Sequence, residues 1–97
     1  MNIRFTPRAL AEAKRIKDWW VRNRPAAPEL FERELAAVLD LIRDIPTVGL
    51  LYSRRDEAEI RWALLPRTRD HVYYTVASDE AAVLSVWGVR RQRGPKL

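Results

Sequence analysis

The segment from Ile60 to Arg93 most constrains the fold, because it predicts three consecutive β-strands with short connections. Residues 60–65 alternate in polarity, and residues 71–76 are rich in aromatic and β-branched side chains, which suit a half-buried pleated surface. Residues 83–89 are more apolar than residues 60–65, so we expect this last strand inside the sheet rather than at its edge. The segment therefore predicts an antiparallel meander with one face that the rest of the chain must cover.

The connections in this segment, and the region before it, predict their structure less clearly than the strands do. Pro66 and Asp70 bound a short polar turn, and residues 77–81 are long enough for a hairpin loop. Residues 48–59 combine an apolar run with a charged run. We expect a loop there, with a partly strand-like conformation as the alternative.

The start of the chain predicts a short strand followed by an amphipathic helix. Residues 1–6 alternate in polarity, and Thr6 followed by Pro7 is typical of a helix start. Apolar residues then recur at helical spacing, and Pro25 predicts that the helix ends near residues 23–24. The apolar positions are Ala9, Ala13, Ile16 and Trp20.

A second helix is predicted to begin at Pro28 and to end before Pro46 and Gly49. A short joint between the two helices favours an antiparallel hairpin whose apolar stripes cover the sheet. The predicted order is β-α-α-β-β-β, an α+β fold with a helical hairpin packed on a small, mostly antiparallel sheet. The stripe of the second helix consists of Phe31, Leu35, Val38 and Ile42.

The composition suits one folded domain spanning residues 1–97, since 47% of the residues are apolar. The absence of cysteine excludes disulfides, thiolate catalysis and cysteine-ligated zinc, and we expect no metal or cofactor. The first residues lack the apolar run of a signal peptide, and no stretch approaches the roughly 18 apolar residues of a membrane span. We therefore expect a cytoplasmic protein without a membrane partner.

The charge of the chain indicates an acidic partner. The formal net charge is +5, and arginine supplies 15 of the 18 basic residues. Arginine is favoured where planar contacts to carboxylate or phosphate matter, although a GC-rich genome also enriches it. Residues 88–97 carry four basic side chains and no acidic one, so this end attracts phosphate backbones or an acidic protein.

Few side chains are candidates for a site, and each also has a structural explanation. His71 is the only histidine and could act as an acid or base, but a lone histidine at a strand start is more often structural. Trp19 and Trp20 are adjacent in one helix, so both cannot face the centre of the core, and the outer one could mark a contact patch. Arg61, with the arginines after the last strand, could form a basic surface or simply be solvated.

The order of elements and several short motifs resemble the RelE/ParE superfamily of bacterial type II toxins. The motifs are T-P-x-A-L at residues 6–10, the aromatic pair Trp19-Trp20, P-x-x-G at residues 46–49, Arg61, V-Y-Y at residues 72–74, and the strand 83–87 running into Arg90-Arg91. The resemblance covers nearly the whole chain. The resemblance implies a small toxin that is made together with an antitoxin. Such an antitoxin is often acidic in its binding segment, and it wraps and neutralises the toxin.

The two branches of this superfamily differ in their targets. RelE-like members cut mRNA in the ribosome, whereas ParE-like members poison DNA gyrase without known nuclease chemistry. By alignment, His71 stands where RelE-type nucleases carry an arginine, and the catalytic tyrosine that they carry beyond the last strand is absent, because no tyrosine follows Trp87. These departures favour the ParE-like branch.

The favoured hypothesis is therefore a non-enzymatic toxin that inhibits DNA gyrase by binding and is neutralised by a ParD-like antitoxin. The expected antitoxin contacts are Trp19, Trp20, Trp62 and Arg61, and the expected target contacts are Arg90, Arg91 and Arg93. The alternatives are a RelE-like, ribosome-dependent mRNA endoribonuclease and a detoxified module that only binds partners. In a nuclease, His71 would be the acid or base, with Arg61, Arg90 and Arg91 holding phosphate.

Overall fold

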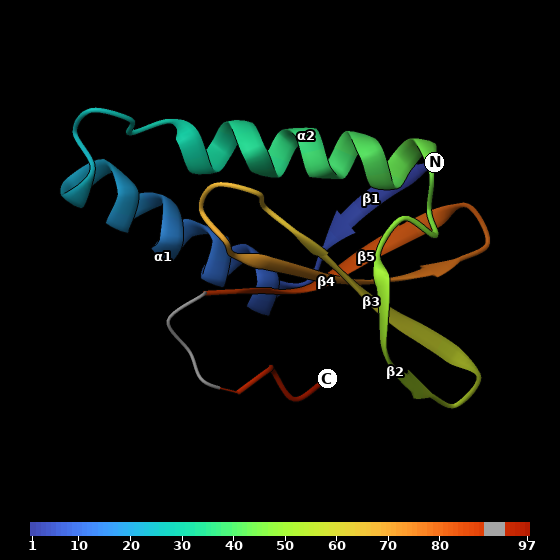
Figure 1. Cartoon of the computed structure of the whole chain (residues 1–97). Coiled ribbons are helices and arrows are strands. Elements are labelled where there is room, and N and C mark those ends of the chain that lie inside the picture. The colour runs from blue at the N-terminus through green and yellow to red at the C-terminus, as the bar shows by residue number, and fades with distance from the viewer. Residues whose placement is uncertain (89–92) are drawn as a thin grey trace.

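Two helices pack on one face of a five-stranded sheet in the computed structural model, which describes residues 1–88 and 93–97 (Figure 1). The elements are β1 (Asn2–Phe5), α1 (Pro7–Asn23), α2 (Leu30–Asp44), β2 (Leu50–Arg55), β3 (Ala58–Leu64), β4 (His71–Ala77) and β5 (Glu80–Trp87). The predicted α+β class and the helical hairpin are confirmed.

The strands lie in the order β1-β5-β4-β3-β2. The pairs from β2 to β5 are antiparallel, whereas β1 runs parallel to β5, with Asn2 opposite Glu80 and Phe5 opposite Val83. The strand β5 therefore has a neighbour on both sides, which confirms that the most C-terminal strand of the meander is an interior one.

The region of residues 48–59 corrects the predicted order, because it contributes a fifth strand. The strand β2 forms a hairpin with β3 through only Asp56 and Glu57, and both residues have positive φ angles, of 54° and 55°. Two consecutive positive φ angles are typical of a type I′ turn, which is usually built from Asn-Gly or Asp-Gly. The sequence Asp-Glu lacks the glycine that usually marks such a turn, so the sequence favoured a loop at this place.

The last connection is also tighter than predicted. The strand β5 begins at Glu80, three residues before the predicted start at Val83, so only Ser78 and Asp79 connect it to β4. Ser78 has a φ of 54°, a conformation that serine adopts at some cost. The predicted end of the strand at Val89 lies outside the described residues.

Both helix starts were predicted, one more accurately than the other. The hydroxyl of Thr6 accepts a hydrogen bond from the Ala9 amide at 3.1 Å, and Pro7 is the first residue of α1. The helix α2 begins at Leu30, two residues after the predicted Pro28, and Glu29 caps it without a side-chain hydrogen bond.

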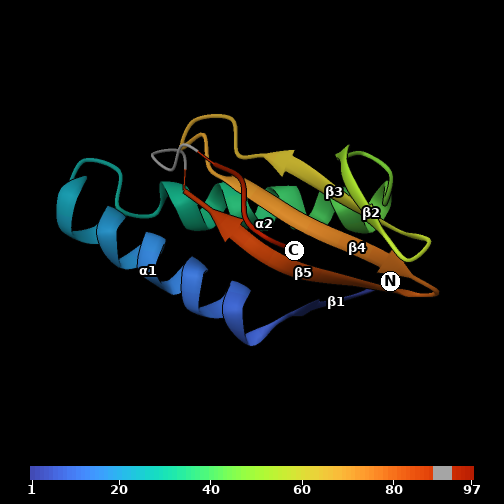
Figure 2. The ribbon, with the colours of Figure 1, turned by 90° about the horizontal axis from the view of Figure 1, so that it is seen from below.

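The main core lies between the helices and the sheet. Figure 2 shows the sheet from the side that carries no helix. Both predicted apolar stripes point into it, since their residues are buried or pack against the buried cluster. The buried cluster consists of Ala9, Ala13, Phe31, Val38, Ile42, Leu65, Val72, Tyr74, Ala81, Val83 and Val86. The opposite face of the sheet has no helix, and residues 93–97 run beside it, where Pro95 is buried.

The hydroxyl of Tyr74 ties the connection between α2 and β2 to the core. It donates a hydrogen bond to the Pro46 carbonyl at 2.8 Å and accepts one from the Gly49 amide at 2.9 Å. A Cβ atom at position 49 would lie 2.7 Å from the Tyr74 hydroxyl, so only glycine allows this approach. The P-x-x-G motif is thus explained by its contact with one buried tyrosine.

Replacing Tyr74 with Phe should lower the free energy of unfolding by about 1–3 kcal/mol, because it removes the partner of a buried amide and of a half-buried carbonyl. Urea unfolding followed by tryptophan fluorescence measures this change. The matched control is Tyr52→Phe, which removes a hydroxyl that donates to the Pro95 carbonyl from a side chain 39% exposed, and should cost less than about 1 kcal/mol. Equal losses in the two variants would contradict the special role of Tyr74.

Candidate functional site: a tryptophan–arginine pocket

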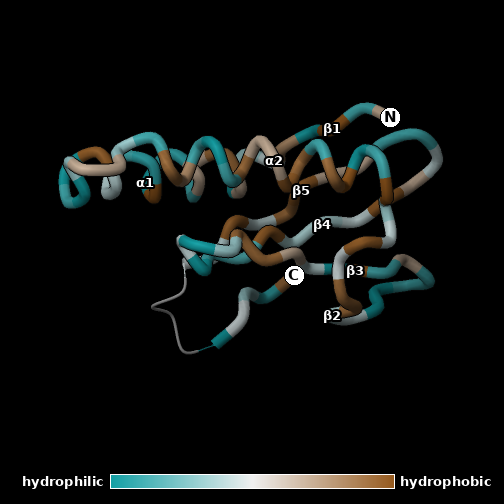
Figure 3. The backbone as a smooth tube through the Cα atoms, turned by 45° about the horizontal axis from the view of Figure 1, so that its top comes forward, coloured by the Kyte–Doolittle hydropathy of each residue, from teal (hydrophilic) through white to brown (hydrophobic). Residues whose placement is uncertain are grey.

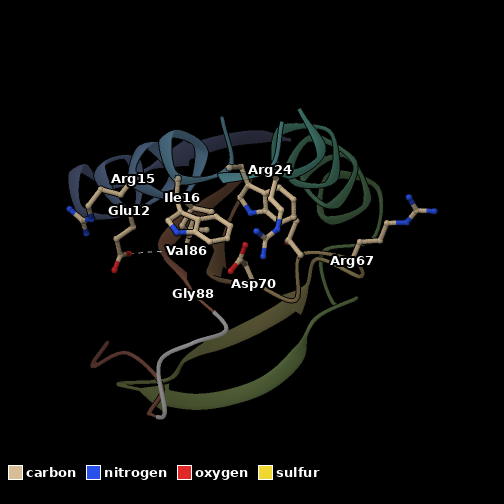
Figure 4. A pocket seen from close by; sticks show the side chains of 11 residues that line it. Glu12, Arg15, Ile16, Arg24, Arg67, Asp70, Val86 and Gly88 are labelled. Atoms are coloured by element: carbon tan, nitrogen blue, oxygen red, sulfur yellow. Dashed lines mark hydrogen bonds between the residues drawn. The ribbon is translucent and has the colours of Figure 1, made fainter. Parts of the chain in front are cut away.

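An open pocket of about 490 Å³ lies between α1, the connection from β3 to β4, and the end of β5 (Figure 4). We call it the Trp pocket. Its lining is Glu12, Arg15, Ile16, Trp19, Trp20, Arg24, Arg67, Thr68, Asp70, Val86 and Gly88. Two of the four predicted antitoxin contacts, Trp19 and Trp20, are in this set.

The aromatic wall of the Trp pocket is held together by ring contacts. The rings of Trp19 and Trp20 meet edge to face, with centroids 5.8 Å apart. The guanidinium of Arg24 lies 4.9 Å from the Trp19 centroid and 6.0 Å from the Trp20 centroid, within the range of a cation–π interaction. Because Trp20 also packs against the core, the wall is anchored at its base.

The buried carboxylate of Glu12 joins α1 to β5 at the floor of the pocket. Its Oε1 atom accepts hydrogen bonds from the Ser85 hydroxyl at 2.7 Å and from the Val86 amide at 3.2 Å, and Arg8 lies 3.5 Å from its Oε2 atom. Sequence reasoning missed Glu12. The available signal was its place three residues after Ala9, where the apolar stripe of the helix would put a core residue.

The loop opposite α1 is fixed by a second carboxylate. Glu34 of α2 accepts hydrogen bonds from the backbone amides of Arg67, at 3.0 and 3.1 Å, and Thr68, at 2.9 Å. The side chains of Thr68 and Asp70 are almost fully buried beneath this loop. The buried Thr68 hydroxyl makes no hydrogen bond within the part of the chain that the structure describes.

The rim of the Trp pocket is positive. Arg15 and Arg67 are exposed, and the ion pairs found among residues 1–88 and 93–97 involve neither of them. The acidic side chains of Glu12 and Asp70 are buried, so their charges are removed from the surface. An apolar side chain flanked by carboxylates would match the aromatic wall and the basic rim.

The other two predicted antitoxin contacts lie elsewhere. Trp62 faces the helix-free side of the sheet and stacks on His71, with ring centroids 4.5 Å apart and planes at 32°. Arg61 points to the opposite side, since it pairs across the sheet with Tyr74. The structure therefore places neither residue beside Trp19 and Trp20.

The guanidinium of Arg61 already has partners in the fold. It donates to the Gly49 carbonyl at 2.8 Å and to the Glu59 carboxylate at 2.9 Å, and Arg54 donates to the same carboxylate. The hydrogen bonds from Arg54 and Arg61 lower the pKa of Glu59, so this carboxylate stays ionised. Arg61 is 22% exposed at its side chain and supports the α2–β2 connection rather than standing free.

His71 lies among aromatic rings. Its Nδ1 atom is 3.3 Å from the Tyr73 hydroxyl, and its ring rests on Trp62. Burial lowers the pKa of His71 below its ordinary 6.5. The charge of Arg69 also lowers this pKa, whereas the charge of Asp70 partly offsets the change by raising it. Arg61 lies on the other face of the sheet, so the two residues do not share a site.

The predicted target contacts are only partly described. Arg90 and Arg91 lie outside the described residues. Arg93 is exposed, and its backbone carbonyl accepts a hydrogen bond from the Trp87 indole at 2.5 Å.

A family described as the ParE toxin of the type II toxin-antitoxin system parDE matches residues 3–94. The chain belongs to the ParE toxin family. The resemblance to the RelE/ParE superfamily is thereby confirmed, and so is its ParE branch.

The fold agrees with a solved structure that carries the same family name. A chain of the "Chromosomal ParDE TA system from P. aeruginosa" superposes with a TM-score of 0.64 at 19% sequence identity, over 93% of this ParE chain and 97% of that one. At this identity the likeness establishes a shared fold alone. No curated protein matches the sequence. Within residues 1–88 and 93–97, no helix combines the length and apolar character that crossing a membrane requires.

The environment of His71 predicts a pH dependence of stability in this ParE family member. A lowered pKa means that the unfolded chain binds a proton more readily than the folded one, so the free energy of unfolding should fall as the pH drops from about 7 to about 5. In His71→Gln most of this fall should disappear, because carboxylates titrate mainly below that range. Chemical unfolding at a series of pH values tests this, and identical slopes in both proteins would contradict it.

Proposed function

We propose that this chain is the toxin of a type II toxin-antitoxin pair that acts in the cytoplasm by binding DNA gyrase, and that a ParD-like antitoxin neutralises it. The observation that carries the proposal is the family match over residues 3–94. The net charge of +5 and the basic, aromatic Trp pocket support an acidic protein partner.

The Trp pocket is the proposed place of the antitoxin contact. An apolar side chain of the antitoxin would enter against Trp19 and Trp20, and neighbouring carboxylates would meet Arg15 and Arg67. Trp62 and Arg61, the other residues proposed from the sequence, would belong to this contact only if the antitoxin also reaches both faces of the sheet. The Trp pocket offers a hollow for an anchoring side chain beside Trp19 and Trp20.

The position of Arg61 does not support the RNA-cleavage alternative that pairs this residue with His71. A nuclease needs a cation beside its acid or base to hold the scissile phosphate. Arg61 is on the other face of the sheet and is bonded to Gly49 and Glu59, so it does not supply that cation. The proposed gyrase contacts are Arg90, Arg91 and Arg93, at the basic end of the chain.

The target is tested by adding the purified chain to a gyrase supercoiling assay and to a cell-free translation reaction. We expect supercoiling to stop while translation continues, and Arg90→Ala combined with Arg91→Ala to weaken the inhibition about tenfold or more. Loss of translation that depends on His71 would instead establish the endoribonuclease alternative. Normal growth on overexpression without antitoxin would indicate a detoxified binding module.

The antitoxin site is tested by reversing one charge at the rim. Arg15→Glu should weaken binding of the ParD-like antitoxin about tenfold, roughly 1.4 kcal/mol, because it opposes the acidic partner. The control is Lys14→Glu, which makes the same charge change at an exposed neighbour that does not line the pocket. Calorimetry or surface plasmon resonance gives both constants, and equal losses would contradict a specific site.

A further inference from the structure

A second surface, at the other end of the molecule from the Trp pocket, exposes apolar side chains. Among the residues that the structure describes, six of the eight exposed large hydrophobic residues belong to the last turn of α2, the following connection and the first half of β2. We call them the edge patch: Leu41, Ile45, Val48, Leu50, Leu51 and Tyr52. Figure 3 shows this apolar stretch at β2, along the outer side of the sheet. Apolar patches of this kind mark contact surfaces or cause aggregation.

The backbone of β2 is open on the same side. Among residues 1–88 and 93–97 the strand pairs with β3 alone and forms one edge of the sheet, so its outward-facing amides and carbonyls have no described strand beside them. Edge strands are usually protected by charges or prolines, but the first three residues of β2 are Leu50, Leu51 and Tyr52. The apolar first half of this edge is a template for an added strand.

A bulge in β2 shapes the patch. Leu51 pairs with Arg61 and Ser53 pairs with Ile60, so Tyr52 is the extra residue without an opposite partner. Its ring turns onto Tyr73, with centroids 4.6 Å apart and planes at 86°. Leu50, 62% exposed, and Leu51, 45% exposed, pair with Trp62 and Arg61, so their side chains lie on opposite faces of this edge.

The second half of β2 is positive. Arg54 and Arg55 are exposed, and Arg54 pairs with Glu59 at 2.9 Å. No ion pair found in the described part of the chain involves Arg55. A complementary strand would therefore carry apolar residues opposite the start of β2 and an acidic residue opposite its end.

We propose that an extended segment of the partner, apolar with an acidic end, pairs with the outer edge of β2 as a sixth strand and covers the edge patch. This inference rests on the proposed function, which supplies the ParD-like antitoxin as the partner. The segment would bind at a distance from the Trp pocket, so one antitoxin would engage the toxin at two separate surfaces.

A second copy of the chain is a poorer occupant of this edge. Full antiparallel self-pairing of β2 would place Leu50 opposite Arg55 and Leu51 opposite Arg54, so each leucine would meet an arginine instead of an apolar side chain. It would also bring together two molecules that each carry a net charge of +5.

Hydrogen–deuterium exchange of the toxin, free and mixed with its ParD-like antitoxin, tests the proposal. We expect amides within residues 50–55 to exchange at least tenfold more slowly in the complex. A complex in which these amides exchange as in the free chain would overturn the sixth strand and leave the proposed function standing. Failure to form any complex would overturn both. Concentration-dependent dimers whose β2 amides are protected without antitoxin would assign the edge to a second copy.

A matched pair of variants gives an independent measurement. Leu50 in β2 and Leu10 in α1 are both 62% exposed, so the same substitution removes the same exposed side chain at two places. Leu50→Lys should weaken antitoxin binding tenfold or more, whereas Leu10→Lys should leave it within about twofold. Equal affinities for the two variants, with both still folded by circular dichroism, would overturn the proposal.

Discussion

The buried hydroxyl of Tyr74 fixes how the helical layer continues into the sheet. Its two hydrogen bonds, to the Pro46 carbonyl and from the Gly49 amide, hold the chain where it leaves α2 and enters β2. Arg61 then bonds to the carbonyl of Gly49, so the same short connection is held from two adjacent strands. The connection therefore works together with the pairing of β2 and β3 to place the edge that we assign to a partner.

Other polar side chains also join the helices to the sheet through hydrogen bonds. In a domain this small, apolar burial leaves little net stability, so the polar contacts at the layer boundary matter more than their number suggests. Glu12 bonds α1 to β5, and Glu34 bonds α2 to the loop before β4. Both carboxylates also shape the Trp pocket, one at its floor and one behind its loop. The elements that stabilise the fold therefore also position the proposed antitoxin site.

The parts of the fold that follow periodicity could be predicted, and those that depend on a single tertiary contact could not. The spacing of Ala9 to Trp20, and the Thr6 cap, located α1 correctly. The strand β2 was only the alternative to a loop, because its turn places Glu57, a residue that rarely adopts a positive φ, where such turns usually have glycine. Its register also contains a bulge, which interrupts the alternation that sequence patterns detect.

Some features of the candidate site could likewise be predicted from the sequence, and others could not. The adjacent pair Trp19 and Trp20 suggested a contact patch, and the structure supplies a hollow beside it. The structural roles of Glu12 and Arg61 could not be foreseen, because their partners are backbone groups and side chains distant in the sequence. A charged residue in an apolar stripe was the only hint, and it does not name a partner.

The parallel pairing of β1 with β5 joins the beginning of the chain to its last strand. Asn2 aligns with Glu80, so nearly the whole polypeptide must have left the ribosome before the first strand can find its neighbour. Contacts so remote along the chain also form slowly. A growing chain therefore cannot complete its sheet until its synthesis is almost finished.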